Sequence, residues 1–383
     1  MKVAVIKIGS RISFNAADTS GGNGEARAII KMLDIGGASV HIYTKILKKD
    51  NLVEPYVWHN LSDDFDTCLR SYDALIVLNG NLNFFGGAED PEQLKNYQII
   101  NQFPGKVFYI LCDPALTLAQ VWPSVQKKEW GSKWSEHDLN IVRNDIICLS
   151  QPHDVDKVLG AIKKNEVLPA AIEHFPFERF PCLNAPLSFN PSPTTDLSYG
   201  GTIRNGRRAR KMVKFYFDHP ADISVEMFGK IKLDDFDQKL LAGINQYPTF
   251  SGPVMYNEML SKMNQSMAHC VIGDPWYEKI NDIPQRLYES IWSGVVTFID
   301  SDMDANRRVL AADKTLSDFL YVSSRQELTE KLQAIKADPS LRQQILDDQF
   351  AAVGFNDRDY CTSFVNQIDV CRSDRFLLAH SRK

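Results

Sequence analysis

The sequence lacks any hydrophobic run long enough to cross a membrane. None of its apolar stretches approaches the roughly 20 residues that a membrane-spanning helix needs. The first ten residues, MKVAVIKIGS, carry lysines inside an apolar stretch, which a secretory signal sequence would not. We therefore expect no membrane partner and a cytoplasmic location.

Paired cysteines and closely spaced metal ligands are also lacking. The 7 cysteines are odd in number and scattered, and no C-x-x-C occurs, which excludes a disulfide framework and argues against a zinc site. The 8 histidines show no ligand spacing, and we interpret His153, His174 and His269 as structural. We predict no protein-bound metal.

An excess of basic residues is the third absence. The formal net charge is −5, which argues against a nucleic-acid partner, because contacts to phosphates supply much of such affinity. A local basic surface would be needed to offset this charge.

What the sequence does contain is an alternation of short apolar runs with helical patterns. The alternation predicts an α/β protein with doubly wound parallel sheets. The runs that we interpret as strands are KVAVIKIG, SVHIYTKI, DALIVLNG, KVFYILCD, DIICLS, ISVEMFG, HCVIGD, VVTFID and FLYVSS. Helices are predicted in EARAIIKMLDIGG, QLKNYQIINQF, YNEMLSKMNQSM and PQRLYESIWSG.

The length of 383 residues predicts two domains. Between about residues 165 and 198 repeated prolines and polar residues interrupt any period, and we interpret this stretch as the linker. The final stretch, from DYCTSF onward, looks helical and could return to the first domain. We predict a first domain of residues 1–178 plus 358–383, and a second of residues 190–357.

Unusual residues gather where predicted strands end. Parallel sheets bind ligands beyond their carboxyl strand ends, so two such sheets would share a cleft there. The residues at these positions are Gly9, Asn79, Asp113, Gly200, Gly201, Gly229 and Asp274.

The segment YGGTIRNGRRARKMVKF is the strongest local signal. Two glycines end a strand-like run and a basic helix follows, so backbone N–H groups and the helix N-terminus could meet a phosphate. At helical spacing one face carries Arg204, Arg208 and Lys211, which suits a diphosphate, and the neighbouring face carries Arg207, Arg210 and Lys214, which could meet DNA. The alternative is a solvated basic helix.

A second cluster lies in IGDPWYEKINDIPQRLYES. Asp274 and Tyr277 follow a predicted strand, and Arg286 and Glu289 are three residues apart on one helix. Such a pair could hold a phosphate and ribose hydroxyls, or its members could simply pair with each other.

Three further segments carry candidate side chains. Asp113 ends a buried strand before Pro114, where it could cap a turn or act as a general base. Asn83, Phe84 and Phe85 lie on a glycine-flanked stretch and could support a distorted base stack, or could pack ordinarily. Asp300-Ser301-Asp302 resembles a metal-binding Asp-x-Asp, but we favour a turn or cap role for it.

Together these segments resemble the DNA β-glucosyltransferases of T-even bacteriophages over nearly the whole chain, in the same order. The resemblance is carried by MKVAVIKIGS, NLNFFGG, CDPALTLAQVWPSV, YGGTIRNGRRARKMVKFYFD, TFSGPV, VIGDPWY with the later RLYE, and FLYVSSRQEL. It implies a GT-B fold with an interdomain cleft, inverting sugar transfer from UDP-glucose to 5-hydroxymethylcytosine in duplex DNA, protection from restriction, and work in the cytoplasm of an infected bacterium, where we expect a monomer.

The same resemblance implies roles for single residues. Asp113 matches the catalytic base, and Glu25 and Asp274 match residues near the donor sugar. The positions that match UDP contacts are Gly201, Thr202, Arg204, Arg208, Val254, Tyr277, Arg286 and Glu289. Asn83, with Phe84 and Phe85, lies in the loop that approaches flipped DNA, which Arg207 and Arg210 could also contact. A divalent ion, Mg²⁺ or Mn²⁺, could assist release of the diphosphate, although the sequence shows no ligand set for it.

Departures from the family leave three alternatives open. The stretch TSGGNGE before Glu25 is longer and richer in glycine than the family segment, and one residue is added between Asp274 and Arg286, so UDP-arabinose is an alternative donor. A second alternative is a GT-B transferase with an acceptor other than DNA. A third is a catalytically silent DNA-binding or anti-restriction protein.

Overall fold

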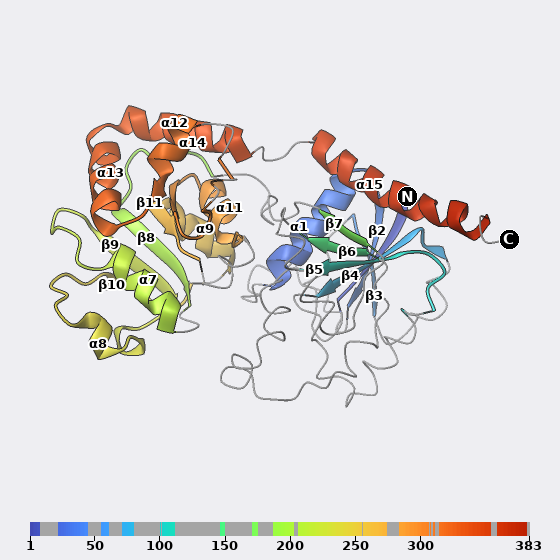
Figure 1. Ribbon diagram of the computed structural model, residues 1–383, viewed down its shortest axis with the longest axis horizontal. Helices are drawn as coiled ribbons and strands as arrows, with labels where there is room; N and C mark the ends of the chain where they lie inside the picture. Colours follow the sequence, from blue (N-terminus) through green and yellow to red (C-terminus); the bar gives the residue numbers. More distant parts are fainter. Residues whose placement is uncertain are drawn as a thin grey trace. The chain divides into compact units, whose positions relative to one another are not determined.

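The computed structural model divides the chain into two compact units, one of Met1–Cys182 with Asn356–Lys383 and one of Leu183–Phe355 (Figure 1). These boundaries differ from the predicted ones by a few residues. The structure describes residues 1–7, 22–44, 55–60, 71–79, 100, 102–111, 146–149, 171–174, 187–202, 206–254, 256–273, 283–305, 307, 309–310, 314–353 and 358–380.

The first unit is built on a sheet of seven parallel strands in the order β3-β2-β1-β4-β5-β6-β7. Its central strands are almost wholly apolar, as expected for a parallel sheet covered on both faces. The strands are β1 (Lys2–Ile6), β2 (Ser39–Thr44), β3 (Val57–Asn60), β4 (Ala74–Asn79), β5 (Val107–Leu111), β6 (Ile146–Leu149) and β7 (Ala171–His174).

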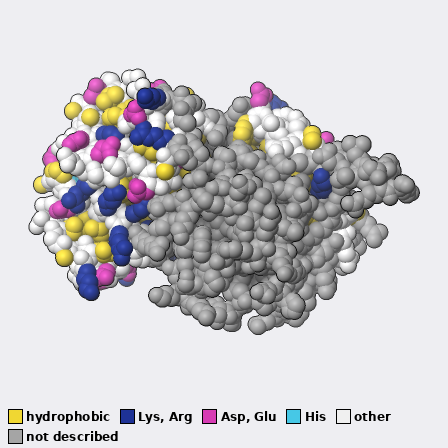
Figure 2. Space-filling view, viewed as in Figure 1, with side chains coloured by type: hydrophobic (Ala, Val, Ile, Leu, Met, Phe, Trp, Pro, Cys, Tyr) yellow, Lys and Arg dark blue, Asp and Glu magenta, His cyan; other side chains and the backbone are white. Residues whose placement is uncertain are grey.

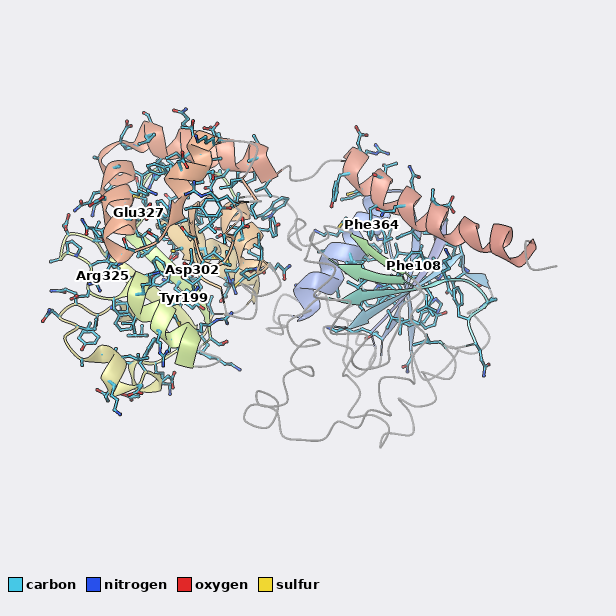
Figure 3. All side chains as sticks on the ribbon, viewed as in Figure 1. Phe108, Tyr199, Asp302, Arg325, Glu327 and Phe364 are labelled. Atoms are coloured by element: carbon cyan, nitrogen blue, oxygen red, sulfur yellow. The ribbon has the colours of Figure 1, made fainter. Side chains whose placement is uncertain are left out.

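Helix α1 (Gly22–Ile35) packs between this sheet and α15 (Arg358–His380), which brings the C-terminal end of the chain back to the first unit. The core joins the helix and sheet side chains, among them Phe108 of β5 and Phe364 of α15 (Figure 3). Gly36, just after α1, lies so close to α15 that a Cβ there would be 2.4 Å from the carbonyl oxygen of Cys361. The predicted return of the C-terminal helix is therefore confirmed.

The second unit contains a six-stranded parallel sheet in the order β10-β9-β8-β11-β12-β13. Strands β11 and β12 are buried at every position, so the core of the unit surrounds them. The strands are β8 (Thr195–Thr202), β9 (Val225–Lys230), β10 (Thr249–Phe250), β11 (Ser266–Val271), β12 (Val296–Asp300) and β13 (Tyr321–Val322).

Helices connect these strands and cover the sheet (Figure 1). Apolar side chains of α7, α11, α12, α13 and α14 point into the same core as the strands. The helices are α7 (Gly206–Tyr216), the short 3-10 helix η5 (Leu233–Asp235), α8 (Gln238–Leu241), α9 (Tyr256–Asn264), α11 (Arg286–Trp292), α12 (Lys314–Leu320), α13 (Arg325–Ala337) and α14 (Pro339–Val353).

The predicted linker of residues 165–198 is wrong in extent. Residues 171–174 form β7, which extends the first sheet by pairing with β6, and β8 begins already at Thr195. Prolines on both sides of the AIEH tetrapeptide hid this short strand, because Pro interrupts the alternation on which strand prediction rests. The strands β3 and β10 were not predicted either, and both are short edge strands.

None of the helices in the described part of the chain has the length and apolar character required to span a membrane.

Candidate functional site

The carboxyl edge of the second sheet gathers the described site residues. In that sheet β8 and β11 are neighbours, but the chain leaves β8 toward β9 on one side and leaves β11 toward β12 on the other. Such a topological switch point opens a crevice between the two departing loops, where open α/β sheets bind ligands. Gly201 and Thr202 end β8, and Gly273 follows β11, so these residues lie at that point.

The two glycines of β8 have a packing reason as well as the predicted functional one. A Cβ on Gly200 would be 2.4 Å from the ring of Phe228 in the neighbouring strand β9. A Cβ on Gly201 would be 3.1 Å from the hydroxyl oxygen of Tyr199 and 3.2 Å from its ring. The two glycines therefore allow neighbouring aromatic side chains to pack closely against β8. Gly201 also lies near the carboxyl end of the strand.

Helix α7 begins at Gly206, after three residues that lie outside the described part of the chain, Arg204 among them. Arg208 is buried at 9% exposure, whereas Arg210 is exposed. The backbone of Arg207 is helical, but its side chain is not among those described. The two predicted faces of α7 thus differ in exposure, because Arg208 on one face is buried and Arg210 on the other is exposed.

Lys211 does not serve the predicted diphosphate face. Its ammonium group forms an ion pair with the carboxylate of Asp300, which ends β12 and is fully buried. Burial raises the pKa of Asp300, and the adjacent charge of Lys211 opposes that rise. Asp302 lies 3.8 Å from Lys211, and its backbone N–H donates to Asp300 Oδ1 at 3.3 Å. The Asp-x-Asp segment therefore makes a turn that is tied to α7 by lysine, in agreement with the turn role we favoured.

Arg286 and Glu289 contact each other, as the simpler interpretation of their spacing suggested. Arg286 Nη1 lies 3.0 Å from Glu289 Oε2 within α11, and the arginine also contacts the sulfur of Met259 in α9. Glu289 is almost completely buried while Arg286 keeps a quarter of its side chain exposed. The buried carboxylate of Glu289 therefore holds the partly exposed guanidinium group of Arg286 in place.

His269 in β11 is structural, as predicted. It is fully buried, and its ring stacks on Tyr199 of β8 with centroids 6.0 Å apart. Burial, together with the charge of Arg286, lowers the pKa of His269 to about 3. The ring is therefore neutral at physiological pH. His174 lies in β7 without a described side chain, and His153 lies outside the described residues.

Val254 belongs to a loop, Ser251–Val254, that follows β10 at the same carboxyl edge, and its side chain is half-buried. Sequence reasoning missed the residues that hold this loop. The hydroxyl of Ser251 donates to Glu226 of β9, and Lys262 Nζ of α9 lies 2.7 Å from the same carboxylate oxygen. It also missed Lys230, an exposed cation that ends β9 directly beside Thr202. Its position at the end of the ISVEMFGK run was the available signal.

The remaining predicted residues lie outside what the structure describes. Asp113 comes two positions after β5, whose last residue pairs with Asn79 at the end of β4. Glu25 lies in the first turn of α1, which begins at Gly22, three residues earlier than predicted, and its side chain is not described. The others outside the described residues are Asn83, Phe84, Phe85, Asp274 and Tyr277.

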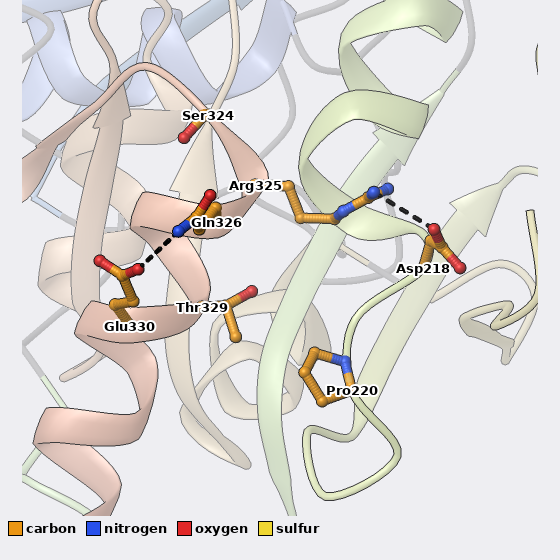
Figure 4. Close-up of a pocket in the computed structure, with 7 residues that line it drawn as sticks. All are labelled: Asp218, Pro220, Ser324, Arg325, Gln326, Thr329 and Glu330. Atoms are coloured by element: carbon orange, nitrogen blue, oxygen red, sulfur yellow. Dashed lines mark hydrogen bonds and ion pairs between the residues drawn. The ribbon is translucent and has the colours of Figure 1, made fainter.

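A pocket of about 420 Å³ lies elsewhere in the second unit, where the start of α13 meets the end of α7 (Figure 4). Its polar side chains are paired with each other, because Arg325 Nη2 lies 3.2 Å from Asp218 Oδ2 and Gln326 Nε2 lies 3.0 Å from Glu330 Oε1. No predicted site residue lines it. We assign it no role.

Two doubly wound parallel units, with a C-terminal helix returned to the first, define the GT-B class of fold, and comparison with solved structures confirms this predicted class. A T4 phage β-glucosyltransferase mutant in complex with UDP-glucose matches with a TM-score of 0.72 and 25% identity, covering 97% of this chain and 100% of that one. The same phage enzyme in complex with UDP and Mn²⁺ matches with a TM-score of 0.67 and 26% identity, covering 98% of each chain.

The sequence comparisons agree with the structural ones. The model of the bacteriophage T4 β-glucosyltransferase family matches residues 1–181. The DNA β-glucosyltransferase of Enterobacteria phage T4 is 29% identical over 352 residues, which covers 91% of this chain and 93% of that protein. The predicted resemblance to the phage DNA β-glucosyltransferases is therefore confirmed across both units, and these relatives are of the predicted class, UDP-sugar-dependent DNA glycosyltransferases.

The buried His269 predicts a pH-dependent loss of stability. Its pKa is about 3 in the folded chain and near 6.5 when exposed, so the unfolded state gains a proton that the folded state does not hold. The free energy of unfolding should fall as pH drops from 6.5 toward 3, by up to about 1.4 kcal/mol per pH unit from this group alone. Urea unfolding of the native chain and of His269→Asn over this range measures it. As pH falls, the free energy of unfolding of the native chain should decrease more than that of His269→Asn. If the two free energies fell in parallel, the low pKa assigned to His269 would be contradicted.

Proposed function

We propose that this chain transfers a sugar from a UDP-sugar to the hydroxymethyl group of 5-hydroxymethylcytosine in duplex DNA, with inversion at the anomeric carbon. Glucose is the donor sugar that the relatives support, since one is a DNA β-glucosyltransferase and another was solved with UDP-glucose. Arabinose is the alternative donor, because the segment before Glu25 departs from the family.

The observation that carries the proposal is the placement of cations at the switch point. The helix after β8 carries Arg208 in its first turn, and the next described helix after β11, α11, begins with Arg286. Because β8 and β11 are adjacent parallel strands, the chain leaves both of them at the same edge of the sheet. A diphosphate at this edge would meet positive charge from both sides, together with the backbone and hydroxyl of Gly201 and Thr202.

The charge pattern of α7 supports an anion at its start. A helix N-terminus carries partial positive charge, so acidic residues are favoured in the first turn and cations are unfavourable there. The first turn of α7 has no acidic residue and two arginines, Arg207 and Arg208. Unfavourable arrangements of this kind are characteristic of binding sites. A bound anion would offset the repulsion between the arginines and the positive end of the helix.

The contacts of Glu289 suit the other half of the donor. Its carboxylate is buried beside Arg286, and a carboxylate, which has several acceptor positions, could accept from a ribose hydroxyl. Val254 ends a loop whose first two residues are hydrogen-bonded to β9, and its own N–H and C=O groups could pair with uracil edges. We assign Tyr277 and Arg204 to the same donor site by resemblance.

The reaction requires a base and a stabilised leaving group. The hydroxymethyl oxygen forms a bond to the anomeric carbon as the bond from that carbon to the β-phosphate oxygen breaks, and UDP departs with the electron pair. A primary alcohol is a poor nucleophile, so we assign Asp113 to accept its proton. Arg204, Arg208 and Arg286 would balance the charge on departing UDP, and Glu25 and Asp274 would orient the sugar.

A divalent ion could accompany the diphosphate, since a relative was solved in complex with UDP and Mn²⁺. The part of the chain that the structure describes contains no group of three His, Cys, Asp or Glu side chains that could ligate one. Asp300 and Asp302, the pair with a suggestive spacing, lie against lysines instead. The arginines can supply the positive charge that the leaving group needs.

The net charge of −5 does not prevent local attraction to DNA. Exposed cations gather on the lower part of the second unit, over α7 and α8 (Figure 2). We define the α7–α8 basic surface as Arg210, Lys214, Lys230, Lys232 and Lys239. Arg210, Lys230, Lys232 and Lys239 form no ion pair with another described residue, whereas nearby Asp235 and Asp237 are used as helix caps. We propose that this surface, with Arg207, contacts the DNA backbone.

The acceptor group lies within the duplex, so the base must be extruded, at a cost of a few kcal/mol. We assign Asn83, Phe84 and Phe85 to the stretch that supports the remaining stack. Modified bases would then escape restriction enzymes of the infected bacterium. A monomer in the cytoplasm of that cell is sufficient for this activity.

The test is mass spectrometry of nucleosides from hydroxymethylated duplex DNA incubated with the protein and either UDP-glucose or UDP-arabinose. A hexose increment is expected, and a pentose increment would establish the alternative donor. Activity on a free acceptor without activity on DNA would support a GT-B transferase of another substrate class. No transfer to any acceptor, with DNA binding intact, would support the silent DNA-binding protein.

The assigned roles predict different kinetic effects for two variants. Asp113→Ala should lower turnover by about 10²–10⁴-fold while UDP affinity stays unchanged, because only proton transfer is removed. Arg286→Ala should weaken UDP binding by about 1.5–3 kcal/mol, roughly tenfold to a hundredfold, because a charge-assisted contact is removed. Calorimetric UDP titration and initial rates measure both effects.

Arg307→Ala, which removes an exposed ion pair with Asp318 in the same unit, is the matched control and should change neither UDP affinity nor turnover. Full turnover by Asp113→Ala would remove the base assignment.

The α7–α8 basic surface predicts a change in salt dependence. For duplex DNA, the slope of log K against log[salt] should become shallower by about 0.9 for every phosphate that the protein no longer neutralises. The double variant Arg210→Ala with Lys230→Ala should therefore show a shallower slope in fluorescence-anisotropy titrations of duplex DNA. Lys336→Ala, an exposed lysine of α13 paired with Asp196, should keep the native slope. Equal slopes for all three proteins would place the DNA-binding surface elsewhere.

A further inference from the structure

Gly229 lies between the two segments that we assign to the two halves of UDP. It belongs to β9, which separates β8 from β10 in the sheet, and it pairs in register with Gly201 at the end of β8. The backbone approach is very close, because a Cβ on Gly229 would be 2.0 Å from the carbonyl oxygen of Gly201. Its φ of +119° is also a conformation that side-chain-bearing residues rarely adopt. Only glycine fits here.

The other side of Gly229 holds the loop after β10. Its N–H donates to the carbonyl oxygen of Gly252 at 2.7 Å, and the N–H of Ser251 donates to the carbonyl oxygen of Met227 at 3.0 Å. The backbone of the Ser251–Val254 loop is therefore attached to β9, although β10 itself has only two residues.

Side chains fasten the same loop a second time. Glu226 of β9 accepts from the hydroxyl of Ser251 and contacts Lys262 Nζ of α9 at 2.7 Å. Glu226 is largely buried, at 12% exposure, so its charge is shielded from competing water. The loop is held to one strand by main chain and by one buried carboxylate.

From these contacts we infer that Gly229 is a positioning residue, which sets the separation between the phosphate turn at Gly201–Thr202 and the base loop Ser251–Val254. One UDP molecule is then recognised at both ends by segments that are already in place. Binding avoids the cost of ordering either segment, because both are attached to the same strand. This inference rests on the proposed donor site.

The experiment compares Gly229→Ala with Gly243→Ala. Gly243 also has a positive φ, +82°, but a Cβ there would meet no atom within 4 Å, so the control reproduces the backbone strain without the contact. Affinities for UDP, uridine and inorganic pyrophosphate are measured by calorimetry, with competition against UDP for the weaker ligands. Gly229→Ala should weaken UDP binding at least tenfold while uridine and pyrophosphate, each of which uses only one segment, bind nearly as before, whereas Gly243→Ala should bind all three as the native protein does.

A second variant keeps the inference testable if Gly229→Ala does not fold. Ser251→Ala removes an exposed hydroxyl that fastens the loop to Glu226, and it should weaken uridine binding while pyrophosphate affinity is unchanged. Native UDP affinity in Gly229→Ala, or native uridine affinity in Ser251→Ala, would overturn the inference. If the native protein itself does not bind UDP, the proposed function fails. The native protein therefore tests the proposed function, and the variants test the role of Gly229.

Discussion

Adjacent parallel strands whose chain continuations diverge are the constraint on which the candidate site depends. Strands β8 and β11 lie side by side, yet the chain continues from β8 to β9 on one side and from β11 to β12 on the other. No side chain has to be strained to create the opening between them, because it results from strand order alone. Gly201, Thr202, the start of α7 and the start of α11 are brought to one edge by this order, and the loop after β10 joins them through β9.

Two of the cations near this edge are held by different carboxylates. Asp300 takes Lys211 out of the site, and Glu289 holds Arg286 from inside α11. Arg208 is buried in the first turn of α7, while Arg210 faces outward. The acidic total charge of the chain thus coexists with a small cationic edge and with the separate α7–α8 basic surface. Net charge describes the solubility of a chain better than it describes what a particular edge can bind.

Much of the fold could be predicted from the sequence, because buried parallel strands are continuous apolar runs between helical patterns. KVAVI and VTFID carry that signal alone, and both are central strands. The short edge strands β3, β7 and β10 were not predicted, because no apolar run marks them, whereas the equally short β6 and β13 were recognised inside the runs DIICLS and FLYVSS. The end of β8 was visible in its glycines, but their packing against Phe228 was not, because that contact depends on which strand becomes the neighbour.

The contacts of the site residues also differ in whether the sequence could predict them. Arg286 and Glu289 lie three positions apart, so their contact follows from helix geometry and could be foreseen. The ion pair of Lys211 with Asp300 joins residues 89 positions apart, and the link from Glu226 to Ser251 crosses from one strand to the next loop. Such partners are determined by tertiary structure, and a sequence without its fold cannot specify them.

The position of α15 has a consequence for how the chain is made. Since α1 packs against this last helix, the core of the first unit includes side chains near the end of the chain, such as Phe364 and Ile368. A ribosome synthesises the second unit, Leu183–Phe355, before it reaches them. The second unit can therefore complete its core during translation, whereas the first unit, although begun earlier, must wait with an exposed apolar helix face until α15 has been synthesised.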